Sequence, residues 1–286
     1  MGYTFGQFNQ EFSDEKVCLD TLFHYRYGEL STCPKCQQET KFYRLKNRKV
    51  YSCLHCRYQL HPLADTIFHK SETPLTKWFF AMFLFANSKN GVSAKELERH
   101  LGVTYKTAWR IARQIRRLMS QDGEEKLSGT VEMDETLIGG YKRGDIGGNT
   151  KGTKQTVIGA VERGGRIKAK HTENRETHTI LNQIQSDIEP GSKLITDEWA
   201  VYHKAKKLGY GRRAIKHLDK KYVRGIVHTN TIEGFWSQLK RSINGTYHVV
   251  SPKYLQLFVD EFSFRYNLRS VSSVYPMLLK RAARPF

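Results

Sequence analysis

The segment Gly129-Thr-Val-Glu-Met-Asp-Glu-Thr-Leu-Ile138 marks a change of periodicity in the 286-residue sequence. Upstream of about residue 122 the apolar residues recur every three or four positions, as in helices, whereas here they alternate with polar ones, as in strands. Similar strand-like runs follow at 155–162, 166–171, 193–196 and around 213–216, and helical patterns cover 177–188, a stretch from 198, 229–243 and 251–266. This order predicts an α/β domain over residues 123–286.

The composition favours a multidomain protein that binds a polyanion. The hydrophobic fraction of 39% is enough for a core, and 47 Lys+Arg against 28 Asp+Glu give a formal charge of +19 at pH 7. Nucleic acid is the leading partner for such a surplus, and a membrane surface is the alternative. The longest apolar run, Trp78 to Ala86, is far shorter than the roughly 20 residues of a membrane span. The N-terminus lacks a secretory pattern, so we expect a thiol-reducing compartment and metal rather than disulfides.

Four of the five cysteines occur as two Cys-x-x-Cys pairs with 16 residues between them, Cys33-Pro-Lys-Cys36 and Cys53-Leu-His-Cys56. This spacing is typical of a zinc ribbon, in which two tight turns complete a closed, structural four-sulfur site for one Zn²⁺. A redox pair and chance are the alternatives. His55 or His61 could replace a thiolate, and Cys18 is interpreted as a buried helix residue. Residues 1–62 are therefore predicted to form an N-terminal helix and a zinc ribbon with short hairpin strands.

Residues 63–122 are predicted to form a helix-turn-helix domain. An aromatic helix is expected over 75–86, and Ser93 caps a second helix that ends at Gly102. A third helix, over 104–118, carries apolar residues on one face and arginines on the others, which would suit a DNA groove. An ordinary helical hairpin with a solvated basic face is the alternative. The candidate DNA-binding residues of this domain are Thr104, Lys106, Arg110, Arg113 and Arg117.

Three acids stand out in the α/β domain: Asp134, Asp197 and Glu233. The two aspartates follow apolar strand residues, where a carboxylate needs a reason to stay ionised, and a hard cation such as Mg²⁺ or Mn²⁺ supplies one. An acid taken alone is more often a helix cap or a surface charge. Lys240 lies two helical turns after Glu233, so the two should share a face on which the ammonium could hold a phosphate.

Long literal stretches of the sequence resemble one known family over nearly the whole chain. These are Met133-Asp-Glu-Thr-Leu-Ile-Gly-Gly140, Thr196-Asp-Glu-Trp199, His228-Thr-Asn-Thr-Ile-Glu-Gly-Phe-Trp236, Gly245-Thr-Tyr-His248, Ser251-Pro-Lys253 and Phe264-Arg-Tyr-Asn267, together with the first cysteine pair. On these motifs the chain is similar to the DDE-type insertion-sequence transposases with an N-terminal zinc ribbon, the ISXO-type group, which resemble the Merlin transposases of eukaryotes.

The sequence thus predicts a multidomain α/β protein with an N-terminal zinc ribbon, a helix-turn-helix domain and C-terminal helices, and the resemblance implies an RNase H-like catalytic core. It makes Asp134 and Asp197 metal ligands and Glu233 the third acid, with His228 and Asn230 as alternative third ligands. Lys240 matches the basic residue that follows the third acid, and Arg241 extends it as a DNA-binding position. Departures from many relatives are expected at Glu198 and Tyr141.

The mechanism that the resemblance implies uses two Mg²⁺ or Mn²⁺ ions about 4 Å apart. They would expose 3′-hydroxyls at the terminal inverted repeats of a mobile element and join them to target DNA, in a homodimer that holds both ends. We expect this in the bacterial cytoplasm or nucleoid, or in a nucleus for a eukaryotic relative. A noncatalytic DNA-binding regulator and a nuclease without joining activity stay open, as does a tyrosine nucleophile among Tyr202, Tyr222 and Tyr247.

Overall fold

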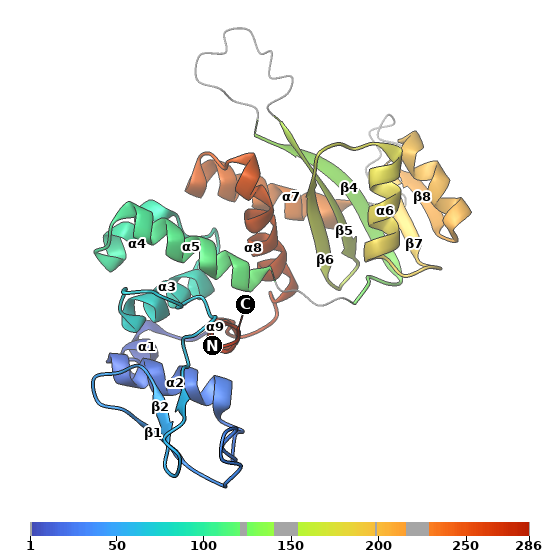
Figure 1. Cartoon of the computed structure of the whole chain (residues 1–286). Helices are drawn as coiled ribbons and strands as arrows, with labels where there is room; N and C mark the ends of the chain where they lie inside the picture. The colour runs from blue at the N-terminus through green and yellow to red at the C-terminus, as the bar shows by residue number, and fades with distance from the viewer. Residues whose placement is uncertain (1, 121–124, 140–153, 198, 216–228, 286) are drawn as a thin grey trace. The chain divides into compact units, whose positions relative to one another are not determined.

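The computed structural model describes all residues except 1, 121–124, 140–153, 198, 216–228 and 286 (Figure 1). It divides into two compact units, residues 1–118 with 271–286 and residues 119–270. No helix in these described ranges is both long and apolar enough to cross a membrane. The predicted boundaries at residues 62 and 122 stay predictions. The contacts divide the chain into two units instead, and they place the C-terminal residues in the first one.

Within its described residues, the first unit combines six helices with a small sheet. The helices are α1 (Phe5–Glu11), α2 (Glu15–Tyr27), α3 (Leu75–Asn87), α4 (Ala94–Leu101), α5 (Tyr105–Met119) and α9 (Tyr275–Ala282). The strands β1 (Phe42–Arg44), β2 (Tyr51–Cys53) and β3 (Gln59–Leu60) form an antiparallel sheet in that order. The hairpin predicted between the cysteine pairs is therefore confirmed.

Aromatic side chains make the core of this unit. Helix α3 buries residues on most of its circumference, so other helices surround it, and α9 returns from the far end of the chain to pack against it. Tyr275 of α9 is 1% exposed and stacks on Tyr3, with ring centroids 4.9 Å apart. The α/β domain predicted over residues 123–286 includes residues 275–282, because local periodicity carries no information on such a distant partner.

Helices α4 and α5 begin and end where their capping residues predict. The Ser93 hydroxyl accepts a hydrogen bond from the backbone N–H of Glu96, which satisfies a free donor of the first turn of α4. Gly102 ends α4 in the left-handed region (φ 56°), a conformation that glycine adopts without a Cβ clash. After two further residues, α5 begins at Tyr105. The helices are thus confirmed, and their action as a DNA-binding helix-turn-helix stays a prediction.

The described residues of the second unit form a five-stranded sheet between helices, with strand order β6-β5-β4-β7-β8. Its elements are β4 (Thr130–Ile138), β5 (Gln155–Glu162), β6 (Ile167–Thr172), α6 (Thr177–Asp187), β7 (Lys193–Asp197), a 3₁₀ helix (Ala200–Leu208), β8 (Gly211–Ile215), α7 (Asn230–Ser242) and α8 (Leu255–Asn267). Strands β4, β5 and β6 are antiparallel neighbours, whereas β7 runs parallel to both β4 and β8. The mixed α/β order predicted from periodicity is confirmed.

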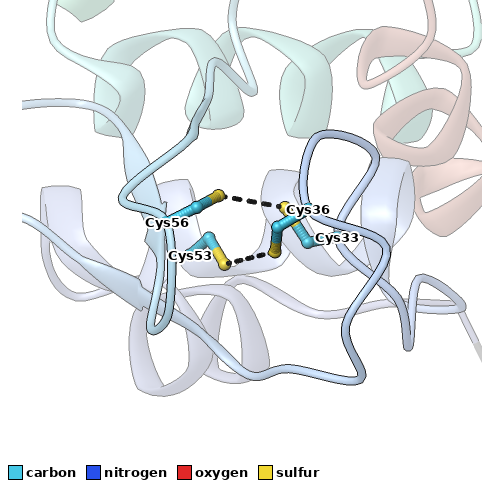
Figure 2. Close-up of side chains that lie close together, drawn as sticks. All are labelled: Cys33, Cys36, Cys53 and Cys56. Atoms are coloured by element: carbon cyan, nitrogen blue, oxygen red, sulfur yellow. Dashed lines mark hydrogen bonds between the residues drawn. The ribbon is translucent and has the colours of Figure 1, made fainter.

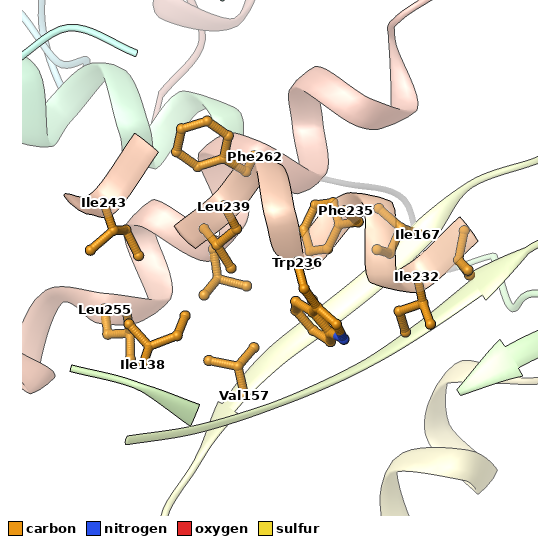
Figure 3. Packing of buried hydrophobic residues seen from close by; sticks show 13 residues of the cluster. Ile138, Val157, Ile167, Ile232, Phe235, Trp236, Leu239, Ile243, Leu255 and Phe262 are labelled. Atoms are coloured by element: carbon orange, nitrogen blue, oxygen red, sulfur yellow. The ribbon is translucent and has the colours of Figure 1, made fainter. Parts of the chain in front are cut away.

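Each face of the sheet has its own core. Val157 and Val161 of β5 point to one face and pack with α7 and α8, as Figure 3 shows for the residues around Trp236 and Leu239. The alternating residues Ile158 and Ala160 point to the other face and pack with α6 and the 3₁₀ helix. Even-numbered and odd-numbered side chains of one strand therefore lie on opposite faces of the sheet. This alternation determines the face on which each acid of β4 lies.

Two predicted helices differ from the observed elements. The stretch expected to be helical from residue 198 forms the 3₁₀ helix, and residues 252–254 form a separate 3₁₀ turn ahead of α8. Pro252 explains the second difference, since it has no N–H and is tolerated only in a first turn. A π-helical turn, Ile243–Tyr247, also continues α7 beyond the predicted end.

Candidate metal centres

The two cysteine pairs fold into matching turns. The N–H of Gln37 bonds to the carbonyl of Cys33 at 2.9 Å, and the N–H of Arg57 bonds to the carbonyl of Cys53 at 3.2 Å. Gln37 and Arg57 both have φ of 58°, so each chain reverses at the residue after its second cysteine. The two turns therefore aim their thiols at one point from opposite sides (Figure 2).

The four sulfurs have the spacing of a tetrahedral metal site. Cys33 Sγ lies 3.6 Å from Cys56 Sγ, Cys36 Sγ lies 3.9 Å from Cys53 Sγ, and all four ligand atoms lie within 4.8 Å of one another. Zn–S bonds of about 2.3 Å at tetrahedral angles put sulfurs about 3.8 Å apart, so the cysteines fit Zn²⁺ closely. His55 instead lies beside the carbonyl of Glu39.

The remaining cysteine is structural. Cys18 is 0% exposed on α2, as predicted, and burial raises the pKa of its thiol to about 12. It is therefore a packing residue, and in the part of the chain that the structure describes the other four cysteines are the only group of three or more possible ligands that converges so closely.

The predicted acids gather where two parallel strands part. Strand β4 pairs with β7 only as far as Glu132 opposite Ile195, and each strand then continues with its other neighbour. Asp134 and Asp197 come two residues beyond this last pair, so they lie on either side of the opening at the carboxyl end of β7 and share a sheet face by parity. Such openings are where ligands enter open α/β sheets.

A buried acid that the sequence analysis passed over fixes α7 beside these aspartates. Glu132 is 0% exposed and accepts hydrogen bonds from the backbone N–H groups of Thr231 (2.9 Å) and Ile232 (3.2 Å), in the first turn of α7. Glu132 Oε1 also accepts the Thr231 hydroxyl at 2.9 Å and pairs with Arg163, whose Nε lies 2.8 Å away. The carboxylate thus caps α7 and holds Glu233, one residue further along, over the sheet.

Replacing Glu132 with Gln should destabilise the protein by about 3 kcal/mol, because the buried Arg163 contact loses its anion and the helix loses a charged cap. The midpoint of urea unfolding, followed by tryptophan fluorescence, measures this. Glu189→Gln, an equal change at an exposed acid, is the control and should shift stability by less than about 0.5 kcal/mol. Equal midpoints for the two variants would contradict the capping role.

Trp236 holds Asp134, and its indole fits there only because residue 159, which pairs with Asp134, is glycine. Trp236 of α7 donates its indole N–H to Asp134 Oδ2 at 3.0 Å. Gly159 pairs with Asp134 across β4 and β5, and a Cβ on Gly159 would come within 2.7 Å of the Trp236 ring. The indole therefore lies across the sheet at Gly159 and orients one Asp134 oxygen.

Burial and neighbouring like charges raise the pKa of Asp134. The main cause is burial, and the carboxylates of Asp197 and Glu233 add to it, whereas the N–H of Glu135 and the indole of Trp236 oppose it. Neighbouring anions that remain without a cation are unfavourable, so the site is electrostatically suited to a divalent metal. The three carboxylates do not form a closed ligand set like the cysteines, which leaves room for water and phosphate oxygens.

Of the other residues predicted for this site, Asp197 is half-buried, several lie on the exposed face of α7, and the rest are outside the described residues. Asp197 accepts the N–H of Trp199 at 3.0 Å, and Glu233 accepts the Thr229 hydroxyl at 2.7 Å. The exposed face of α7 carries Asn230, Glu233, Lys240 and Arg241, which confirms that Glu233 and Lys240 share a face. His228, Glu198, Tyr141 and Tyr222 lie outside the described residues.

Glu135 belongs to the opposite sheet face. It accepts a hydrogen bond from Tyr202 Oη at 2.8 Å, and burial, with the charges of Asp134 and Asp197, raises its pKa to about 7. Tyr202 is 0% exposed with its pKa raised well above the usual value by burial. Tyr247 donates to Glu261. Neither tyrosine has the exposed, activated hydroxyl of a nucleophile.

The candidate DNA-binding residues in α5, and Thr104 just before it, differ in their exposure to solvent. Thr104, Lys106 and Arg113 are exposed. Arg110 instead donates to the Ser71 hydroxyl at 2.9 Å and lies over the Trp78 ring, and Arg117 donates to Gln114. Fewer of the predicted DNA-binding side chains are therefore exposed than the number of arginines in this helix suggests.

Comparisons with known proteins cover both the cysteine cluster and the carboxylate site. Residues 13–59 match a family model described as the transposase zinc-ribbon domain, and residues 126–267 match one described as the ISXO2-like transposase domain. The chain is also similar to a Halobacterium salinarum protein described as an uncharacterized protein in transposable element ISH50. The two are 25% identical over 274 residues, which is 89% of this chain and 91% of that protein.

Proposed function

Because the chain belongs to the ISXO2-like transposases that carry an N-terminal zinc ribbon, we propose that it is an active DNA transposase. It binds the terminal inverted repeats of its element, cleaves there to expose 3′-hydroxyls and joins these to target DNA. The observation that carries the proposal is the approach of Asp134 and Asp197 at the opening between β4 and β7, with Glu233 on the helix above.

The fold agrees with this activity. Three antiparallel strands, two further parallel strands and a helix over the central strand support the RNase H-like core that the resemblance implies. Mg²⁺ keeps several waters and binds through one or two carboxylates and substrate phosphates, so it does not need the closed cage that zinc has in the ribbon. An open arrangement of three acids suits it.

Each residue then has a defined task. Asp134 and Asp197 would hold two Mg²⁺ or Mn²⁺ ions, which when bound activate the attacking oxygen and stabilise the leaving one. Trp236 keeps one Asp134 oxygen in place, and Glu233 faces the same opening from the exposed side of α7. Lys240, two turns further along this face, holds a DNA phosphate.

The DNA partner is inferred from charge and from the first unit. A net charge of +19 favours duplex DNA, and the exposed Lys106 and Arg113 offer contacts on α5. Joining two element ends in one reaction requires two active sites, so we infer a homodimer that acts where the cell keeps its DNA.

The experiment that tests the function uses the full chain, a duplex carrying the element end and a supercoiled target. Transposition predicts Mg²⁺-dependent cleavage at the end and a covalent product that joins it to the target. Cleavage without a joined product would identify a nuclease, and binding without cleavage would identify a regulator.

Arg113 and Arg110 provide a matched pair of predictions on α5. Arg113→Ala should reduce the slope of log K against log salt by about 0.9, because one phosphate contact is lost. Arg110→Ala should instead lower the melting temperature and leave the slope unchanged, since its guanidinium already bonds to Ser71. Fluorescence anisotropy at several salt concentrations and thermal unfolding measure both. The reverse pattern would contradict these roles.

A further inference from the structure

The hairpin between the two cysteine pairs carries an unusual concentration of positive charge. Residues 41–49 contain five cations and no acid: Lys41, Arg44, Lys46, Arg48 and Lys49. All five are exposed. Lys49 pairs with Glu15 at 2.9 Å, and the other four form no ion pair within the described residues. These exposed charges make the hairpin a concentrated cationic surface, which attracts a polyanion.

A groove lies on one side of this hairpin. It has a volume of about 480 Å³, and its lining includes Arg48, Lys49, His61, His69 and Lys70 with no acidic residue. A second hollow of about 370 Å³ lies between the hairpin and α2 and shares Arg48 and Lys49. Arg48 therefore faces two hollows, and the hairpin tip is open to a large ligand.

Hydrogen bonds of Arg26 and Glu15 fix the walls of the groove, and the exposed side chains of Arg48 and Lys70 extend from these walls. Arg26 of α2 donates from one Nη1 to the carbonyls of His61 (3.3 Å), Pro62 (3.0 Å) and Ala64 (2.5 Å), which shapes the far wall. Glu15 ties the hairpin to α3 by accepting from Lys49 and from the N–H of Leu75. The groove is thus preformed, and binding would order only long side chains.

We propose that this hairpin and its groove bind the phosphate backbone of duplex DNA, as a second contact separate from α5. The proposal rests on the DNA partner of the proposed function and adds the surface that holds it. A two-stranded hairpin is narrow enough for the major groove, which is about 12 Å wide, and Arg48 and Lys70 then reach phosphates on its edge. Tyr43, 43% exposed on β1, adds a hydroxyl for the backbone.

The test compares two double variants of the zinc-loaded full chain. Arg48→Gln with Lys70→Gln should weaken binding to duplex DNA about tenfold and reduce the salt slope by about 2, because two phosphate contacts are lost. Lys16→Gln with Lys280→Gln removes the same charge from exposed positions outside both hollows and should leave the slope unchanged. Anisotropy with an end duplex and with a scrambled duplex measures each, and both duplexes should be affected alike.

Three results would overturn the proposal: an unchanged slope in the groove variant, an equal loss in the control variant, or a preference of the groove for RNA duplex over DNA duplex. Zinc content and circular dichroism show that both variants fold. Because the readout is binding, its outcome is independent of catalysis. A chain that binds DNA through the groove without cleaving it would refute the proposed function and leave the groove assignment standing.

Discussion

Asp134→Asn should lower the rates of end cleavage and joining by at least about a thousandfold, because the proposed metal site loses a charge that no neighbour replaces. The amide is isosteric and its oxygen still accepts the Trp236 indole N–H, so the fold is retained. Rates of strand cleavage and of joined product, measured at saturating DNA, give the effect. Asp197→Asn should behave in the same way.

The same variant should be more stable than the wild type in the absence of divalent metal. The pKa of Asp134 is raised in the folded protein, so the native state favours the neutral acid, and wild-type stability falls as pH rises through that pKa. Asn carries no charge at any pH, so the melting temperatures should differ at pH 7 and converge in acid. Mg²⁺ should raise the melting temperature of the wild type only.

Glu135→Gln is the matched control, because it makes the same chemical change one residue away on the opposite sheet face. It should keep at least about a tenth of the activity. If both variants were equally active, or equally inactive, the assignment of Asp134 to the metal site would be wrong.

Cys33→Ser should reduce the zinc content from one ion per chain to none and unfold the ribbon. Structural zinc contributes about 10–16 kcal/mol to the folding of small zinc domains, far more than three short strands can supply without it. Metal analysis and limited proteolysis within residues 30–60 report the two losses.

Cys18→Ala is the control for removing a thiol. The substitution removes a buried packing atom of α2 rather than a zinc ligand, so the variant should keep one zinc per chain and lose some stability. A Cys33→Ser protein that retained full zinc would overturn the ligand set.

Local sequence signals predicted the elements well. The run at 155–162 coincides with β5, and Ser93 and Gly102 mark the ends of α4, because alternation and capping act over a few residues. The cysteine spacing likewise predicted a cluster that the four sulfurs confirm.

Such local signals do not predict contacts between residues that lie far apart in the sequence. Glu132 looked like one acid among several, and its role as a buried cap depends on α7, about 100 residues later. The fit of Trp236 over Gly159 requires the register of β4 with β5, which periodicity does not specify. Both contacts lie beside the carboxylate site, so the geometry of this site depends on residues that are far apart in the sequence.

Titration of the zinc-loaded chain with Mn²⁺ in the presence of an element-end duplex, followed by electron paramagnetic resonance, tests the metal assignment most directly. The account predicts two Mn²⁺ per chain in the wild type and a loss of this binding in Asp134→Asn and Asp197→Asn, with Glu135→Gln unaffected. Undiminished Mn²⁺ binding in both aspartate variants would contradict it.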